Sequence, residues 1–346
     1  MTKKILTRKK EHLQIANDEP IHFHELTTGF EDYHFVHNAL PEIDLKDVNI
    51  KANFLGYELQ SPLMISSISG GEDESKQLNR DLARAANQSG IALSLGSIRP
   101  ALENPECIGS YQIARKEAPN IPIIANIGAS QLVKEYKSKQ LSKILKQIDV
   151  NAISIHLNPL QEALQPEGEP HFKGVSRAIE ILRETLPYPV IVKEVGFGLS
   201  LDAIKRLQKM GIQWVDVAGS GGTSWSRIEH HRMKSQNKKD IATQFFEWGI
   251  PTVESIQNAI KVKQMKIIAS GGIDTGLKFA KAIALGAELA GAAIPFLQAR
   301  NKGGVTRVCD LINVYSETLR IAMFCTGNQD LARFRGNKSI ISYRKL

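Results

Sequence analysis

The chain has 346 residues, 42% of them hydrophobic and 23% charged, as in a soluble globular protein of one large α/β domain or two smaller ones. No apolar run approaches the roughly 20 residues of a membrane span, and the first residues lack the apolar core of a signal peptide. Three cysteines, far apart and odd in number, argue against a disulfide scaffold. We therefore expect a cytoplasmic protein that does not bind a membrane.

The formal net charge of +8 suits a nucleic acid or a small anionic substrate such as a phosphate ester, or describes only a solvated basic surface. The basic residues are dispersed, and aromatic residues for stacking on bases make up only 6% of the chain. These two features favour a small-molecule ligand and no nucleic acid.

In chain order, residues 1–61 form an N-terminal extension that we expect to fold over the rest, and residues 62–346 form the main domain. From residue 62 onward, short apolar runs alternate with segments of helical spacing. In 200–211, for example, apolar residues recur at three-residue steps up to a terminating glycine. The runs predicted as strands are 62–68, 91–96, 122–128, 152–158, 189–196, 214–219, 266–272 and 289–293.

Eight strand–helix units predict a (β/α)8 TIM barrel, whose usual size is about 250 residues. An open, doubly wound sheet is the alternative, but no GxGxxG motif follows the first predicted strand. The segment after Leu95 is ambiguous because Pro100 and Pro105 interrupt it. Residues 224–248 form a long polar insertion after the sixth strand, and we expect a functional or disordered loop there.

Hydrogen-bonding residues or glycines follow nearly every predicted strand. At the end of the fourth, His156, Asn158, Gln161 and Glu162 lie within seven residues. Because the carboxyl ends of barrel strands meet at one face, we expect an active site there. The other residues at these ends are Ser66, Ser67, Ser69, Gly70, Gly71, Ser97, Arg99, Asn126, Gly128, Lys193, Gly221, Gly222, Thr223, Gly271 and Gly272.

Small residues follow the seventh and eighth predicted strands, in ASGGI (269–273) and GAAIP (291–295). Glycine lets the backbone approach a ligand closely, and N–H groups at the start of the next helix then face an anion. A glycine pair is weak evidence alone, since glycine is common in turns. With GGT at 221–223, the two segments predict a phosphate site.

Two charged residues each have a functional and an ordinary interpretation. Lys193 lies in the apolar run VIVKEVG, where it either faces inward with a polar partner or is a surface lysine. Glu162 is a candidate magnesium ligand, because Mg²⁺ takes one or two carboxylates with waters and substrate phosphates. Alternatively, Glu162 only favours the dipole of the helix that it opens.

Two basic motifs lie away from the strand ends. Arg8, Lys9 and His12 in RKKEH are ordinarily solvated, but on an extension that covers the barrel they can neutralise an anion. The histidines of EHHR (229–232) look catalytic, yet without a strand end beneath them such loop residues are usually exposed.

Several longer motifs point to one family. The most specific are HLNPLQE (156–162), QPEG (165–168) and AGSGGTSW (218–225), whereas the glycine pairs occur in many flavin barrels. The others are RKKEH (8–12), HNALPE (37–42), SGG (69–71), GSIR (96–99), ANIG (125–128), VKEVGFG (192–198), ASGGI (269–273) and AIPFL (293–297). Over residues 8–297 the chain resembles the type 2 isopentenyl-diphosphate isomerases, which are FMN enzymes on a (β/α)8 barrel.

The resemblance implies conversion of isopentenyl diphosphate to dimethylallyl diphosphate in isoprenoid biosynthesis. Reduced FMN would act as acid and base, Mg²⁺ would hold the diphosphate, and NAD(P)H would only reduce the flavin, because the reaction is redox-neutral. The implied substrate-binding residues are Arg8, Lys9, His12, Ser97, Arg99, His156, Asn158 and Gln161, with Glu162 on the metal. The implied FMN-binding residues are Ser67, Ile68, Ser69, Ser97, Asn126, Lys193, Thr223, Gly271, Gly272, Ile273, Ala293 and Ile294.

The resemblance further implies that Gln161, His156 and Lys193 take part in catalysis, with Lys193 stabilising negative charge on the reduced ring. It also implies a homo-oligomer, either a tetramer or an octamer. Ile68 and Ser69 replace a common Met-Thr pair, and Ile98 replaces a polar residue. The choice between NADH and NADPH stays open, as does whether the flavin or a side chain removes the proton.

A 2-hydroxy-acid oxidase that uses FMN is the alternative enzyme. It would need a histidine base beside an arginine that binds a carboxylate. HHR (230–232) offers these residue types but follows no strand end. A nucleotide dehydrogenase fits poorly, because none of the three cysteines follows the GGTS loop.

Overall fold

Eight parallel strands form a closed barrel in the computed structural model, which describes residues 11–12, 14–16, 19–68, 73–134, 136 and 138–344. Each strand pairs with the next in the chain, and β11 closes the barrel by pairing with β4. The (β/α)8 barrel is thus confirmed over the open sheet. The strands are β4 (Leu63–Ile65), β5 (Ala92–Ser97), β6 (Ile123–Gly128), β7 (Ala152–His156), β8 (Val190–Lys193), β9 (Trp214–Asp216), β10 (Lys266–Ala269) and β11 (Leu289–Ala292).

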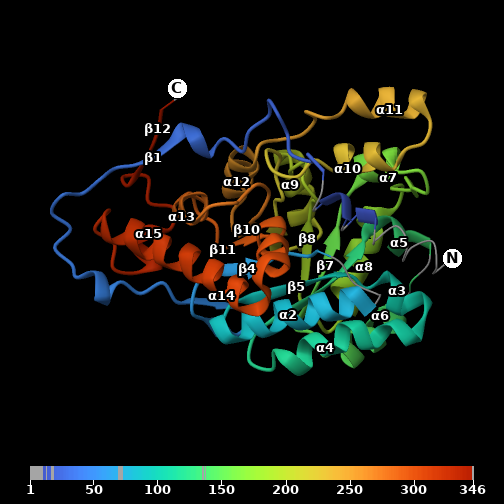
Figure 1. Cartoon of the computed structure of the whole chain (residues 1–346), viewed down its shortest axis with the longest axis horizontal. Coiled ribbons are helices and arrows are strands. Elements are labelled where there is room, and N and C mark those ends of the chain that lie inside the picture. Colours follow the sequence, from blue (N-terminus) through green and yellow to red (C-terminus); the bar gives the residue numbers. More distant parts are fainter. Residues whose placement is uncertain are drawn as a thin grey trace.

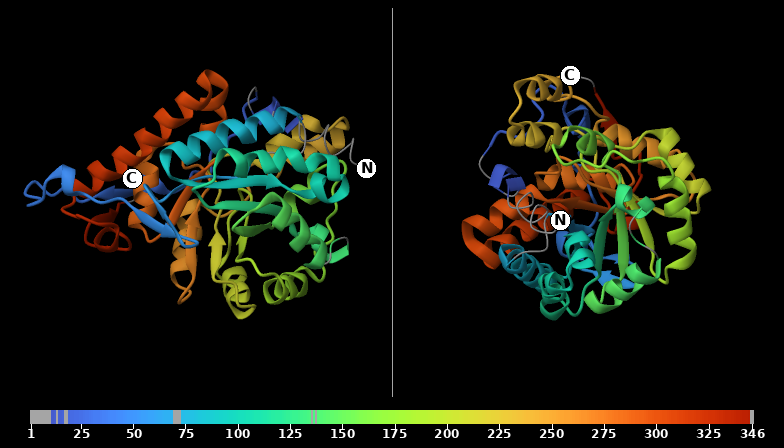
Figure 2. Two further views of the ribbon diagram at one scale, coloured as in Figure 1. Left: turned by 90° about the horizontal axis from the view of Figure 1, so that it is seen from below. Right: turned by 90° about the vertical axis from the view of Figure 1, so that its right-hand side faces the viewer.

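Helices surround the barrel (Figures 1 and 2). Around Pro100 and Pro105, where the sequence was ambiguous, the chain forms α3 (Arg99–Glu103), η3 (Pro105–Ile108) and α4 (Gly109–Glu117). The long α14 (Ile294–Phe324) bends at Gly303 and Gly304. The remaining helices of the ring are α2 (Asp73–Ser89), α5 (Ala129–Lys134), α6 (Ser138–Ile148), α7 (Pro159–Leu164), α8 (Val175–Thr185), α9 (Leu201–Lys209), α12 (Thr252–Ile260) and α13 (Gly276–Ala284). None of the helices in the described residues is long and apolar enough to cross a bilayer.

The amino-terminal half of the barrel interior is apolar. Each strand contributes one buried side chain to a single cluster, and the hairpin of β2 (Ala52–Phe54) and β3 (Tyr57–Leu59) packs against it. The Phe54 and Trp214 rings meet edge to face, with centroids 5.0 Å apart. The strand residues of this apolar layer are Met64, Ala92, Ile124, Ala152, Ile191, Trp214, Ile268 and Leu289.

Two residues further along the chain, seven of the eight strands are followed in the interior by a polar residue, and β11 by Gly291. Because strand side chains alternate with a period of two, residues i and i+2 face the same side. The second layer therefore lies directly above the first, towards the carboxyl ends of the strands. The members of this polar layer are Ser66, Ser94, Asn126, Ser154, Lys193, Asp216, Ser270 and Gly291.

In the N-terminal segment (described residues 11–12, 14–16 and 19–32), residues 21–23 lie beside the loop after β9. The N–H of Phe23 donates to the carbonyl of Gly222, and the N–H of Ser224 donates to that of Ile21. Further on, β1 (Tyr33–Phe35) pairs with β12 (Ile341–Tyr343), so residues 33–35 lie beside residues 341–343. The division into domains at residue 61 stays a prediction.

Residues 224–248 contain two helices, so the expectation of a loop was wrong. They form α10 (Trp225–Arg232) and α11 (Gln236–Thr243), and Figure 1 shows α10 beside α7. The Ser226 hydroxyl is buried and donates to the carbonyl of Phe245, while the Arg227 guanidinium lies over the Phe246 ring. The insertion is held by these polar and aromatic contacts and buries only a few apolar side chains, such as Ile228 and Met233, so its sequence shows little apolar periodicity.

Glu247 joins this insertion to the N-terminal segment. Its carboxylate accepts hydrogen bonds from the backbone N–H groups of His24, Glu25 and Leu26, and from Arg227. Burial alone would raise the pKa of this carboxyl, but the four donors outweigh it and lower the pKa to about 2. The resulting stabilisation is complete above pH 4.5 and is lost as the pH falls towards 2.

We expect Glu247→Gln to loosen residues 24–26, because a neutral amide cannot hold four donors as the carboxylate does. Hydrogen exchange at these amides should accelerate about tenfold or more at pH 7. The difference from the native chain should shrink between pH 4.5 and 2. Glu184→Gln, at an exposed position, is the matched control. Equal protection of residues 24–26 in both variants at pH 7 would contradict this role.

Candidate active site

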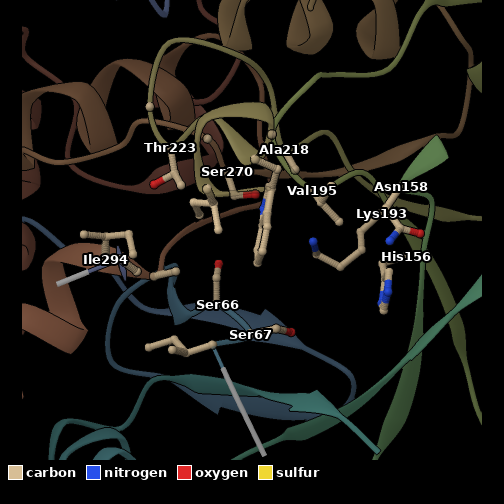
Figure 3. A pocket seen from close by; sticks show the side chains of 18 of the residues that line it. Ser66, Ser67, His156, Asn158, Lys193, Val195, Ala218, Thr223, Ser270 and Ile294 are labelled. Atoms are coloured by element: carbon tan, nitrogen blue, oxygen red, sulfur yellow. The ribbon is translucent and has the colours of Figure 1, made fainter. Parts of the chain in front are cut away.

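A cavity of about 490 Å³ opens at the carboxyl ends of the barrel strands, a size typical of cofactor and substrate sites. Figure 3 shows side chains entering it from opposite sides, with Lys193, Asn158 and His156 on one side and Thr223 and Ile294 on the other. All the predicted site residues in the described part of the chain line this cavity. Arg8, Lys9 and Ser69 lie outside the described residues, and the roles of the others stay predictions.

The predicted substrate residues and the predicted flavin residues share this cavity. From the first group it is lined by His12, Ser97, Arg99, His156, Asn158, Gln161 and Glu162. From the second it is lined by Ser67, Ile68, Ser97, Asn126, Lys193, Thr223, Gly271, Gly272, Ile273, Ala293 and Ile294.

His156 stands at the end of β7 beside Asn126 of β6. Its Nδ1 lies 2.9 Å from Asn126 Oδ1, which as a carbonyl oxygen can only accept a hydrogen bond. This contact assigns the proton to Nδ1 and directs the other ring nitrogen, Nε2, past Gly128. The neighbouring strands thus fix both the orientation and the tautomer of the ring.

Glu162 takes part in a buried network at the start of α7. Its Oε1 accepts from Asn158 Nδ2 at 3.0 Å, and its Oε2 accepts from Gln165 Nε2 at 2.6 Å and from the Glu169 N–H at 2.7 Å. The carboxylate is therefore turned into the cavity wall and is only 6% exposed. Asn158 Oδ1 is buried without a protein partner, so it can accept from a ligand.

Sequence reasoning missed Glu229 on α10, a fully buried carboxylate behind the cavity. Its Oε1 accepts from Gln161 Nε2 at 3.1 Å and lies 3.0 Å from His12 Nε2. Its Oε2 accepts from Arg232 Nη1 at 2.7 Å. Burial opposes ionisation, but His12 and Arg232 together hold the pKa of Glu229 below its ordinary value.

Arg232 is the second residue that sequence reasoning missed. Its guanidinium is 7% exposed and pairs with Glu11, Glu167 and Glu229, which belong to the N-terminal segment, the loop after α7, and α10. The EHHR motif (229–232) did mark this part of the site, but its buried, interacting residues are Glu229 and Arg232 and not the two histidines. Neither His230 nor His231 lines the cavity.

Lys193 is buried at the end of β8 and faces the cavity, which excludes the surface-lysine interpretation. Its ammonium donates to the carbonyl of Glu194. On the next strand, Asp216 is its register partner, and Asp216 Oδ1 accepts from Ser270 Oγ at 2.6 Å. Burial raises the pKa of Asp216, whereas Lys193 and Ser270 act in the opposite direction.

Arg99 enters the cavity from α3 and is held by two carboxylates. Its Nη1 and Nη2 donate to Glu169 at 3.0 and 3.2 Å, and its Nε donates to Glu103 at 2.7 Å. The guanidinium is therefore positioned and charged, but an entering anion must compete with Glu169 for it.

Glycines line the opposite wall because side chains do not fit there. A Cβ on Gly271 would stand 2.1 Å from the carbonyl oxygen of Gly219, and one on Gly222 would stand 2.4 Å from the Gly272 nitrogen. Gly271 and Gly272 also have φ values of +100° and +63°, which favour glycine. Beside them α14 begins at Ile294, so this wall offers backbone N–H groups to an anion.

Comparisons with known proteins agree with this arrangement. Residues 158–341 match the family described as FMN-dependent dehydrogenase. A Nostoc relative named isopentenyl-diphosphate delta-isomerase is 40% identical, covering 96% of this chain and 95% of its own. Relatives of the same name from Methanothermobacter thermautotrophicus and Halobacterium salinarum are 41% and 44% identical, covering 98% and 93% of this chain and 94% and 89% of theirs.

Solved structures share the fold at low identity. A flavocytochrome b2 variant with sulfite bound has a TM-score of 0.71 and 17% identity, covering 99% of this chain and 92% of its own. A mandelate oxidase variant has a TM-score of 0.61 and 16% identity, with 94% and 90% covered. At these identities the likeness concerns the barrel alone.

We expect Arg232→Met to destabilise the protein, because it leaves the buried Glu229 carboxylate with less compensating charge. The loss should be on the order of 3 kcal/mol in the free energy of unfolding. Hydrogen exchange in residues 14–16 should also rise. Arg206→Met is the control, since its pair with Asp202 is solvent-exposed and contributes little. A loss no larger than that of the control would show that the three ion pairs do not act on stability.

Proposed function

The chain belongs to the isopentenyl-diphosphate delta-isomerase family, and from this premise we propose that it converts isopentenyl diphosphate to dimethylallyl diphosphate with FMN. One observation carries the proposal. The cavity joins a glycine-lined wall and an inward lysine, suited to a flavin, to a histidine–asparagine–glutamine–glutamate set suited to a diphosphate and a metal. A 2-hydroxy-acid oxidase is less well supported, because its histidine–arginine candidates, His230 and His231 with Arg232, do not line the cavity.

The residues present fit FMN. Ser66 Oγ is buried beside the cavity without a protein partner, and Asn126 and Ser270 add further polar groups to the same floor. Lys193 would face the ring, and Gly271 and Gly272 would receive the phosphate. Bound and reduced, FMN supplies the acid–base chemistry that protonation of an unactivated alkene requires and that few side chains possess. NAD(P)H would serve to reduce it.

The residues also fit Mg²⁺, provided that the diphosphate completes its coordination. No group of three His, Cys, Asp or Glu side chains among the described residues could hold a metal. Glu162 therefore stands as a single carboxylate ligand, and Mg²⁺ typically binds through one or two carboxylates with waters and substrate phosphates. We propose that metal and substrate enter together.

The diphosphate would be bound by basic and amide groups that the fold already orients. Asn158 and His156 are fixed by Glu162 and Asn126, and Arg99 is held nearby by Glu169. His12 would add a donor from the N-terminal segment, together with Arg8 and Lys9. Prior orientation lowers the entropic cost of binding and leaves more binding energy for catalysis.

Gln161 would position the prenyl group of the substrate, and Glu229 would hold Gln161 in place. Its side chain accepts from Asn158 and donates to Glu229, so its orientation is set at both ends. Glu229 and His12 are in contact, and this pair can hold a proton at the edge of the cavity. We propose that Gln161, His156 and Lys193 act on the reacting atoms, while Glu229 stabilises Gln161.

The proposal also covers the cellular compartment of the enzyme, its oligomeric state and its N-terminal extension. We propose that it works in the cytoplasm, which the small, odd number of widely spaced cysteines supports. We further propose a tetramer or octamer, supported by exposed apolar side chains on α13 and α14, Leu277 and Ile321 among them. Residues 1–61 would be the extension that covers the FMN-binding barrel of residues 62–346.

Glu162→Gln is expected to raise both the magnesium requirement and the KM for isopentenyl diphosphate. Losing one charged ligand should cost on the order of 2–4 kcal/mol, or about 30-fold to 1,000-fold in KM. The visible spectrum of bound FMN should not change, which separates this effect from misfolding. Glu180→Gln, on the outer face of α8, is the control. Unchanged magnesium dependence would show that Glu162 only favours the dipole of α7, in whose first turn it lies.

The enzyme should be inactive with oxidised FMN and active once dithionite or NAD(P)H has reduced it. Moving a double bond changes no oxidation state, so many products should form for each reductant consumed. Product formation and NAD(P)H absorbance can be followed in the same anaerobic cuvette. In deuterated water, deuterium should enter the product methyl group. Full activity with oxidised flavin, or one reductant consumed per product, would overturn the proposed reaction.

A further inference from the structure

The polar layer of the barrel contains one ammonium and one carboxylate, Lys193 and Asp216. They are register partners on the adjacent strands β8 and β9, and both face the barrel interior. Lys193 borders the cavity, whereas Asp216 is 2% exposed and does not line it. Neither the substrate set nor the proposed catalytic residues account for a carboxylate at this position.

Asp216 is held firmly in place. Ser270 Oγ donates to its Oδ1 at 2.6 Å, and the backbone N–H of Ala218 donates to the same carboxyl. From β10, the residues packed against it are Ile268 and Ser270. The next charged group on that strand, Lys266, lies at the far end over the Trp214 ring. Lys193 is thus the cation that faces Asp216.

Among the described residues, few polar side chains face Lys193 as well. Across β7 its register partner is His156, whose ring is bound to Asn126. Its own neighbour Glu194 directs its side chain to the N–H groups of Val195, Gly196 and Phe197. Among the described residues of the polar layer, Asp216 is therefore the carboxylate beside Lys193, whereas Glu194, whose carboxylate also interacts with Lys193, lies outside that layer.

We propose that Asp216 opposes the charge of Lys193 and so sets the net electric field that acts on the flavin. The inference rests on the FMN of the proposed function but not on the isomerase reaction. A carboxylate one strand away shares the ammonium with the ring and weakens its attraction for negative charge. The reduced flavin ring can then carry negative charge without a large rise in the midpoint potential of the flavin. That balance suits a reaction in which the flavin exchanges protons and gives up no electrons.

Sulfite measures this field directly. Its sulfur lone pair forms a bond to N5 of the oxidised ring, the C4a–N5 π bond breaks, and the electron pair moves to the N1–C2=O region as negative charge. No oxidant or reductant is needed. An unshielded cation near N1 therefore tightens sulfite binding and raises the midpoint potential of the flavin.

The test is a sulfite titration of FMN-loaded protein, with the midpoint potential measured in parallel. Asp216→Asn keeps an acceptor for Ser270 and should lower the sulfite Kd by about tenfold and raise the potential. Asp202→Asn removes an equal charge at an 80% exposed position and should change neither value. An unchanged or weaker sulfite affinity in Asp216→Asn would overturn the proposal.

A double-variant cycle keeps the test decisive if Asp216→Asn folds poorly. Lys193→Met leaves Asp216 uncompensated and should weaken sulfite binding by about tenfold. Adding Asp216→Asn restores neutrality and should recover most of that loss. A double variant no better than Lys193→Met would exclude a role for Asp216. A wild-type protein that binds FMN and sulfite but lacks isomerase activity would overturn the proposed function and leave this inference standing.

Discussion

Side chains that alternate along the barrel strands are the constraint on which the rest of the structure depends. Each strand contributes one apolar residue to the lower interior and, two residues later, a polar residue or glycine to the layer above. The apolar layer packs against Phe54 and Leu59 of the β2–β3 hairpin and closes the amino-terminal end. It adds to the larger apolar core of strand and helix residues, and the burial of both stabilises the barrel. Within the polar layer Ser270 donates to Asp216 on the neighbouring strand, whereas the buried hydroxyls of Ser66 and Ser154 have no protein partner among the described residues.

The active site extends this arrangement outward. His156, Lys193 and Ser270 stand at the ends of strands whose spacing is set by backbone hydrogen bonds, so their mutual positions are rigid. Glu162 and Asn158 follow on the first turn of α7, where buried contacts orient them. The chemistry proposed for this site needs little motion of the barrel itself. The part that must adapt to the substrate is the outer layer, which consists of α10, the loop after α7 and the N-terminal segment.

Ion pairs help to hold that outer layer, together with buried apolar residues such as Ile21 and Ile228. Arg232 pairs with carboxylates from three separate segments, and Glu247 binds three backbone N–H groups of the N-terminal segment. Unlike apolar contacts, ion pairs can exchange partners with an entering anion. A cover of this kind suits a charged substrate, because the diphosphate can replace the carboxylates, as Glu169 on Arg99 illustrates.

The amino-acid sequence alone determined the barrel and its polar mouth, because strand periodicity and strand-end residues are local features. Each of the eight predicted runs became a strand, and the HLNPLQE and GGTSW motifs marked two of the loops that line the cavity. It did not reveal Glu229, Arg232 or Asp216. Their importance comes from partners distant in the chain: His12 and Gln161 for Glu229, and Lys193 for Asp216. An isolated acid or arginine has no periodicity, so only the folded arrangement could show that these charges are buried and compensated.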